Sequence, residues 1–264
     1  MVKVTGVGFS CADVYEKLNK FYPTGNGVDW GVHLRRMGIP VSIVSVVGTD
    51  KYGALMKDAL QKEEIDVSHL RVEEGDTCKM MMDLRNGTDR VHLEEIEGVM
   101  ANYALTDEEI AFVKEHDYMH TDLFGKILNH LPEFHHSGVK VVMDFSVFSA
   151  EPEYECEKIF PYVDYAFLSY EQDDAYIKDW IKKIQSYGPK IVTATLGEHG
   201  SISWDGKTLY RHGIVPVQVV NTVGAGDSYI AGFTYGIING WDIPACMKKG
   251  TETSAKVITQ FEPY

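Results

Sequence analysis

The chain has 264 residues, 44% of them hydrophobic and 24% charged, which is the balance of an ordinary globular domain. Its 39 acidic and 25 basic residues give a formal net charge of −14, which argues against nucleic acid or an anionic membrane as a partner. The four cysteines are widely spaced, no metal-ligand spacing occurs, and no apolar run reaches the roughly 20 residues of a membrane span. We therefore expect one cytoplasmic domain, residues 1–264, with reduced thiols.

Short apolar runs alternate along the chain with longer amphipathic stretches. The first clear strand pattern is VSIVSVV at 41–47, and a helical pattern around 55–60 follows it. Further strand patterns lie at 118–121, 140–145, 163–169 and 190–196, and helical patterns lie near 106–115, 125–136, 152–161, 172–187, 225–239 and 243–260. Apolar strands separated by helices predict an α/β fold, with a mainly parallel central sheet and helices on both faces. Ligands of such sheets collect at the carboxyl ends of the strands.

Two segments interrupt this alternation. Residues 77–97 read as strand, turn, strand, and Asn86-Gly87 at the turn is a strong hairpin signal. We interpret them as a small β lid. Because an exposed two-stranded element is poorly stable alone, we expect a homodimer in which the lids of two copies pair. Asp205-Gly206 marks a second hairpin, and 215–220 reads as a strand.

The strongest chemical signal is the run NTVGAGDS at 221–228. Gly224 and Gly226 let the backbone approach a ligand closely, and the free amides at the start of the following helix form a site for an anion. Asp227, beside that site, would accept the proton of a hydroxyl that attacks a phosphoryl group. The alternative is an aspartate that only caps the helix. The eight residues alone leave both interpretations open.

This run resembles DTxGAGD, the C-terminal signature of the ribokinase-like (PfkB) sugar kinases. Three other segments resemble motifs of that family in the same order: 25–38 resembles GGNxxNxAxxLxxLG, 47–53 resembles VGxDxxG, and 195–201 resembles TLGxxG. The resemblance spans the whole chain. It implies a ribokinase-like three-layer sandwich that transfers the γ-phosphoryl group of ATP to a sugar hydroxyl, with Asp227 as catalytic base. The anion hole would be formed by Gly224, Ala225 and Gly226.

Within this family the chain resembles the fructoselysine 6-kinases, through Arg90-Val91, residues 97–101 and Ala104-Leu105. That resemblance implies phosphorylation of the 6-hydroxyl of a fructosyl amino acid. Two alternatives stay open. One is a kinase of another small molecule, such as fructose, ribose or a nucleoside. The other is a non-catalytic binding protein on the kinase scaffold.

The resemblance also assigns the remaining site residues. Sugar ligands are expected to be Asp13, Gly25, Asn26, Asp29 and Arg90. Nucleotide contacts are expected to be Ser169, Thr195, Gly197, Gly200, Gly250 and Ser254. Asp13 has the alternative of a turn residue at the end of the first strand, and Arg90 that of a solvated hairpin arginine. Glu94, Glu95 and Glu97 are either receivers of a cationic substrate tail or an ordinary solvated charge run.

Several family positions differ in this chain. Asn221 replaces the first Asp of the signature, which argues against activation by K⁺. Thr24 replaces the first Gly of GGN, and Asp29 replaces the second Asn, adding a carboxylate that would attract a substrate ammonium. Gln172 replaces the Glu of the family's NxxE motif, which is tied to Mg²⁺. Glu171 or Asp173 are the candidate substitutes, and we expect Mg²⁺ to be held largely through water.

Overall fold

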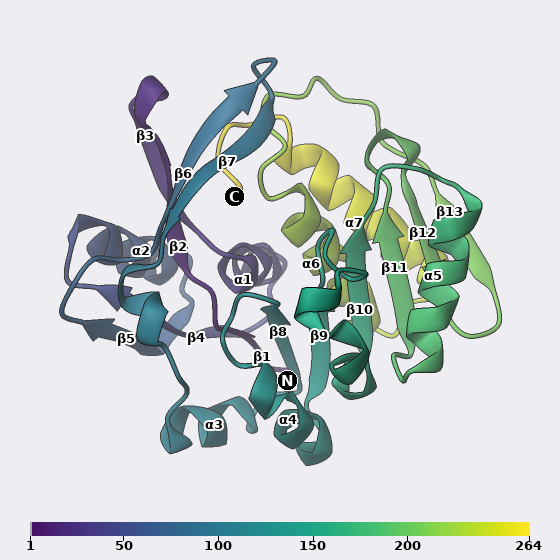
Figure 1. The fold of residues 1–264 in the computed structure, drawn as a ribbon, viewed down its shortest axis with the longest axis horizontal. Coiled ribbons are helices and arrows are strands. Elements are labelled where there is room, and N and C mark those ends of the chain that lie inside the picture. The colour runs from purple at the N-terminus through teal and green to yellow at the C-terminus, as the bar shows by residue number, and fades with distance from the viewer. Residues whose placement is uncertain (1) are drawn as a thin grey trace.

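The computed structural model describes residues 2–264, and its centre is a nine-stranded sheet (Figure 1). The strands follow the order β13-β12-β11-β10-β9-β8-β1-β4-β5. Their bounds in chain order are β1 Val4–Val7, β4 Val41–Gly48, β5 Asp66–Glu73, β8 Tyr118–Asp122, β9 Lys140–Asp144, β10 Tyr165–Ser169, β11 Ile191–Thr195, β12 Ser201–Trp204 and β13 Leu209–His212. The seven strands from β5 to β11 along this order pair in parallel, whereas β12 and β13 pair antiparallel at one edge. The predicted mainly parallel sheet is confirmed.

Helices cover both faces of this sheet and complete three layers. One face carries α1 Asn26–Arg36, α2 Lys51–Lys62, α6 Ala225–Ile238 and α7 Ile243–Val257. The other carries α3 Asp107–Val113, α4 Leu131–Ser137 and α5 Ala175–Ser186. Short 3-10 turns connect the elements: η1 Glu16–Leu18, η2 Gly98–Asn102, η3 Leu128–His130, η4 Pro152–Tyr154, η5 Cys156–Lys158, η6 Phe160–Tyr162 and η7 Gly197–His199. None of the helices within residues 2–264 has the length and apolar character that crossing a membrane requires.

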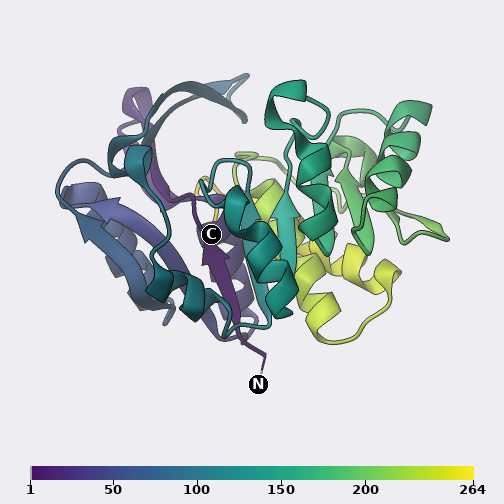
Figure 2. The same ribbon diagram turned by 60° about the horizontal axis from the view of Figure 1, so that its bottom comes forward.

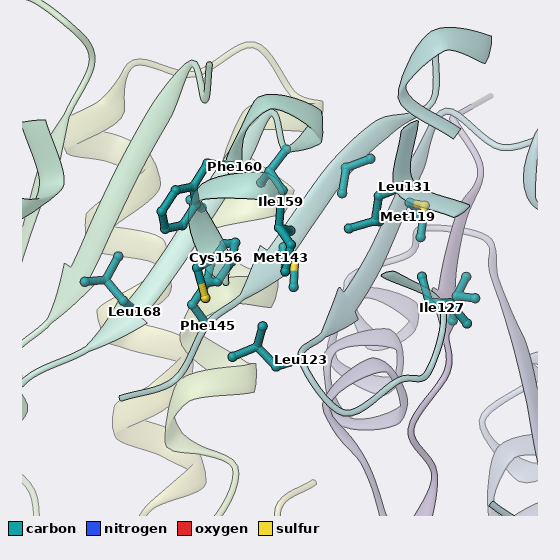
Figure 3. Close-up of a cluster of buried hydrophobic side chains, with 14 of the residues drawn as sticks. Met119, Leu123, Ile127, Leu131, Met143, Phe145, Cys156, Ile159, Phe160 and Leu168 are labelled. Carbon is teal, nitrogen blue, oxygen red and sulfur yellow. The ribbon is translucent and has the colours of Figure 1, made fainter. Parts of the chain in front are cut away.

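The core beneath α3, α4 and α5 shows why the apolar runs form strands. Met119 on β8 and Met143 on β9 are fully buried against Leu131 of α4 (Figure 3). The ring of Phe145 lies 4.9 Å from that of Phe160, centroid to centroid. Strands buried on both faces tend to be apolar runs, as Val41–Gly48 in β4 and the VVM segment at 141–143 in β9 are.

A separate four-stranded sheet forms the lid, in the order β3-β2-β6-β7. Its strands are β2 Cys11–Tyr15, β3 Lys20–Thr24, β6 Lys79–Arg85 and β7 Asp89–Ile96. The lid arches away from the sheet domain (Figure 2). The hairpin predicted at 77–97 corresponds to β6 and β7, and Asn86 and Gly87 at its turn both have positive φ. The sequence did not indicate β2 and β3. Asp13 lies in the middle of β2, a lid strand, and not at the end of the first strand as expected.

Two predicted elements are wrong. Residues 152–161 form the 3-10 turns η4, η5 and the start of η6, and the left-handed backbone of Glu155, with φ +45°, interrupts the segment where an α-helix would continue. Residues 215–220 are not a strand. They follow β13 as an exposed segment that no neighbouring strand pairs with, although Val215, Val217 and Val219 have high strand propensity.

Candidate active site

A cavity of about 970 Å³ lies between the lid and the carboxyl ends of the sheet strands. Lid residues Asp13, Met80 and Arg90 border it on one side. Asp144 at the end of β9 and Thr195 at the end of β11 border it on the other. This is the edge at which open α/β sheets bind ligands, and the volume is near the upper end of the range for small-molecule sites.

Asp227 lies in the first turn of α6 and faces this cavity. The turn that precedes it requires glycine at one position: Gly224 has φ +68°, and a Cβ there would lie 2.7 Å from Pro263 Cβ. Ala225 and Gly226 begin the helix and border the cavity. Their position at a helix N-terminus suits an anion, since the first amides of a helix have no partner within it.

The carboxyl of Asp227 is only 9% exposed, and its Oδ1 has no hydrogen-bond partner among the described residues. Burial and the charge of Asp144 together raise the pKa of Asp227 to about 7, against the opposing charge of the Arg90 guanidinium. Such a carboxyl is ionised just above neutral pH and remains basic enough to take a proton. If Asp227 only capped the helix, its Oδ1 would accept a backbone N–H. Because Oδ1 accepts none among the described residues, the geometry favours the interpretation of Asp227 as a catalytic base.

The residues expected to bind the sugar meet at the start of α1 and on the lid. Gly25 has φ +146°, and a Cβ there would lie 2.4 Å from the carbonyl oxygen of Phe9. Asn26 Nδ2 donates to Asp144 Oδ2 over 3.2 Å. The tight turn therefore presents Asn26 to the end of β9. Gly25, Asn26 and Asp13 all border the cavity.

The two departures from the GGNxxN motif contact one another. The hydroxyl of Thr24 donates to Asp29 Oδ2 over 2.7 Å. Asp29 is 1% exposed and borders the cavity, and its Oδ1 has no hydrogen-bond partner among residues 2–264. Burial and the charge of Asp227 hold the pKa of Asp29 well above its usual range. The threonine thus orients the extra carboxylate that the aspartate brings.

Arg90, on β7, supplies the positive charge of this region. Its guanidinium lowers the pKa of Asp13, Asp29, Asp144 and Asp227. Burial outweighs it at Asp13, whose pKa rises to about 7. One arginine facing four carboxylates belongs to a binding region, so the solvated-hairpin alternative is the weaker one.

Two carboxylates of this cluster were missed in the sequence. Asp122 ends β8 and Asp144 ends β9, and burial raises the pKa of Asp122 to about 7 and that of Asp144 to about 6. The sequence contained a signal for both aspartates. Each lies at the carboxyl end of a predicted strand of the parallel sheet, where ligands of such sheets collect.

The nucleotide-side residues occupy the ends of the later strands. Ser169 Oγ lies 3.3 Å from Thr195 Oγ1, across the ends of β10 and β11. Ser169, Thr195, Gly197, Gly200 and Ser254 border the cavity. Gly250 is absent from the cavity lining; it packs against Tyr229, and the next residue, Thr251, borders the cavity instead.

An apolar wall completes this end of the cavity, and it too was missed as part of the site. It consists of Ile214, Val215, Val217 and Val219, all at least 36% exposed, together with Ile258 after α7. Val215, Val217 and Val219 belong to the segment wrongly predicted as a strand, and the apolar surface suits the face of a purine base.

The metal-handling residues are sparse. Within residues 2–264, no group of three or more His, Cys, Asp or Glu side chains is placed to hold a metal ion. Asp173 is bound by Arg211, Nη2 to Oδ1 at 3.0 Å, and by Lys178 at 2.8 Å. Glu171 borders the cavity. Of the two substitutes for the NxxE glutamate, Glu171 is the one that faces the nucleotide end.

Asn221 is fully buried and makes two hydrogen bonds. Its Nδ2 donates to the carbonyl oxygen of Phe261 over 2.8 Å, and its Oδ1 accepts from the amide of Val223 over 3.1 Å. An aspartate here would place a second acceptor against the Phe261 carbonyl, and a cation or a proton between them would be needed to relieve the repulsion. The asparagine amide provides that contact itself.

The model of the pfkB family of carbohydrate kinases matches residues 13–264, and the chain therefore belongs to this family. It is a sugar kinase, a phosphotransferase with an alcohol group as acceptor. The chain is 36% identical over 258 residues to fructoselysine 6-kinase of Escherichia coli (strain K12), covering 98% of both proteins. It is 30% identical over 260 residues to a fructosamine kinase of Bacillus subtilis (strain 168), covering 97% of this chain and 90% of that protein.

Solved structures agree on the fold. Arabidopsis thaliana ribokinase complexed with ribose and ATP superposes with a TM-score of 0.82 at 17% identity, over 98% of this chain and 94% of that one. A putative ribokinase II of E. coli in complex with ATP and Mg²⁺ gives a TM-score of 0.84 at 16% identity, over 100% and 94% of the two chains. The ribokinase-like fold expected from the motifs is confirmed.

Proposed function

We propose that this kinase transfers the γ-phosphoryl group of ATP to the 6-hydroxyl of fructoselysine or a closely related fructosamine. The observation that carries the substrate is the 36% identity, over 98% of both chains, to a fructoselysine 6-kinase. The site supports the reaction, because a buried carboxyl, a helix N-terminus and an arginine border one cavity.

In the proposed mechanism, Asp13, Asn26 and Asp29 hydrogen-bond the sugar hydroxyls and direct the 6-hydroxyl at Asp227. The bond from oxygen 6 to the γ-phosphorus forms while the bond from that phosphorus to the β-γ bridging oxygen breaks. The 6-hydroxyl proton passes to Asp227, and ADP leaves with the bridging oxygen. The amides of Ala225 and Gly226 stabilise the charge of the transferred group, since a loose transition state depends mainly on positioning and electrostatics.

Mg²⁺ supplies charge neutralisation on the phosphates when it is bound. The donor set fits an ion held by phosphate and water, because the nucleotide end of the cavity offers, within residues 2–264, only the separate carboxylates of Glu171 and Glu198 without an ion-pair partner and no cluster of ligands. Glu171 is the residue we propose to hold it, through water. For monovalent cations we propose independence of K⁺, because the Asn221 amide makes the contact that a cation would otherwise bridge.

Two further expectations remain proposals. We propose that the protein acts in the cytoplasm, where ATP is available. We also propose a homodimer through the lid, because Leu18, Phe21 and Ile96 on the lid are 36–45% exposed and β7 is an open sheet edge. A monomeric mass by light scattering at micromolar concentration would contradict the dimer.

A coupled assay of ADP formation over a panel of acceptors tests the substrate. Fructoselysine and a second fructosamine are compared with fructose, ribose and adenosine at equal concentration. We expect kcat/KM to be highest for a fructosamine. Turnover of ribose or adenosine with none of either fructosamine would reject the proposed substrate.

A further inference from the structure

The cavity extends beyond the sugar-binding residues to an opening between lid strand β7 and the loops after β8 and β9. We call this opening the mouth; it is lined by Phe9, Leu93, Phe124, Val147 and Phe148. Three of these apolar side chains are exposed: Leu93 by 59%, Val147 by 58% and Phe124 by 37%. The Phe124 ring contacts that of Phe148 edge-on, with centroids 5.7 Å apart. The mouth is therefore an open, mostly aromatic surface continuous with the site.

A β-bulge in β7 decides which glutamate shares a face of the lid sheet with Met80. His92 pairs with Met82 and Glu94 pairs with Met81, so Leu93 is an extra residue without a partner on β6. Residues directly opposite in an antiparallel ladder share a face. Glu95 pairs with Met80, and both border the cavity. In a regular strand Glu94 would follow His92 on that face; the bulge gives the position to Glu95, and Glu94 borders the cavity from the position opposite Met81.

Within residues 2–264, the carboxylate of Glu95 makes no ion pair, and the one cation that acts on its pKa, Lys126, is bound to Glu97. The nearby ammonium of Lys126 binds Glu97 Oε1 at 2.6 Å and the carbonyl oxygen of Ala101 at 3.1 Å. Partial burial and the charge of Glu97 raise the pKa of Glu95, which Lys126 only partly opposes. The charge of Glu95 also raises the pKa of Asp122, which lies two residues before Phe124.

We propose that the mouth binds the tail of the acceptor as an alkyl chain ending in an ammonium group, with the chain along Phe124, Phe148 and Leu93 and the ammonium at Glu95. Apolar walls fit methylene groups, and an ammonium is attracted both by the unpaired carboxylate and by the aromatic faces. A tail ending in a carboxylate meets like charge there. This inference rests on the proposed fructosamine kinase activity and names the chemistry of the tail.

Three acceptors that share the fructosyl group test it: fructosyl-cadaverine, fructosyl-pentylamine and fructosyl-aminohexanoate, whose tails end in an ammonium, a methyl and a carboxylate. We expect kcat/KM to fall in that order, with the first exceeding the last at least about tenfold, the worth of one modest charge interaction. The difference should appear in KM more than in kcat, because the tail is remote from the transferred group.

Glu95→Gln removes the charge and keeps the shape. We expect it to reduce the ratio of kcat/KM between the ammonium and carboxylate tails to within about threefold, less than one modest charge interaction. Glu115→Gln is the matched control: Glu115 is exposed just before β8, at the end of that strand opposite the cavity, and the parent ratio should persist.

The outcomes separate this inference from the proposed function. Phosphorylation of all three fructosyl amines by the parent with kcat/KM values within about threefold of each other would overturn the tail site and leave the fructosamine kinase standing. A parent ratio that survives in Glu95→Gln would overturn the role of Glu95. Turnover of fructose or ribose with none of the fructosyl amines would overturn both proposals.

Discussion

Asp227→Asn removes the proton acceptor and leaves a side chain of nearly the same size. The carboxyl is buried beside the N-terminus of α6, with Oδ1 free to face the acceptor hydroxyl. A positioned general base contributes about 10²–10⁴-fold to rate, so the variant should lose about 3 to 5 kcal/mol of transition-state stabilisation. We expect kcat to fall by that factor in a coupled assay of ADP formation, while ATP affinity by titration calorimetry stays close to that of the parent.

Stability distinguishes lost chemistry from lost folding. Because the pKa of Asp227 rises to about 7, above the roughly 3.9 of an unfolded aspartate, protonated Asp227 favours the fold, and that stability is lost as pH rises through about 7. At pH 8 the asparagine variant avoids a buried charge. Its Tm should therefore equal or exceed that of the parent. Activity within about tenfold of the parent would refute the assignment of Asp227 as base.

The remaining predictions concern the surroundings of Asp227. The kcat/KM of the parent should rise with pH through about 7, as Asp227 ionises. Asp122→Asn should shift this rise in the pH–rate profile to lower pH, because the charge of Asp122 raises the pKa of Asp227. A profile that stays in place in the variant would contradict the coupling between the two carboxyl groups. Asn221→Asp should make activity depend on K⁺, whereas the parent should show nearly equal rates in potassium and choline salts; a parent strongly activated by K⁺ would contradict the role of the amide. Gly224→Ala should lower Tm by about 5 °C, because a side chain at this left-handed residue would be strained against Pro263. The same substitution should lower kcat by distorting the anion hole. A variant with the parental Tm and kcat would show that the turn tolerates a side chain.

The sequence predicted the central sheet well because strands buried on both faces leave an unbroken apolar run, as at 41–47. It missed the lid strands β2 and β3, where five-residue segments carry Asp13 and Pro23 and show no clear alternation. It also mistook 215–220 for a strand. Propensity reports how well a residue suits a strand, and it does not reveal whether a neighbouring strand is present to pair with it.

The site was predictable where motifs specify the backbone, as at Gly25 and Gly224. What a motif does not encode is which distant groups converge on it. The hydrogen bond between Thr24 and Asp29 joins two departures from the family pattern, and the bulge at Leu93 puts Glu95, in place of Glu94, on the face of the lid sheet that carries Met80. Both depend on three-dimensional placement, which a list of residues in chain order does not contain.

The tip of the lid is tied directly to the loop that precedes the anion hole. The amide of Thr222 donates to the carbonyl oxygen of Thr88 over 3.3 Å, and the amide of Arg90 lies 3.5 Å from the hydroxyl of Thr222. These two contacts make the lid tip part of the support of the anion hole. The same hairpin carries Arg90, so one element both steadies the amides that would face the phosphoryl group and brings the positive charge to the carboxylates.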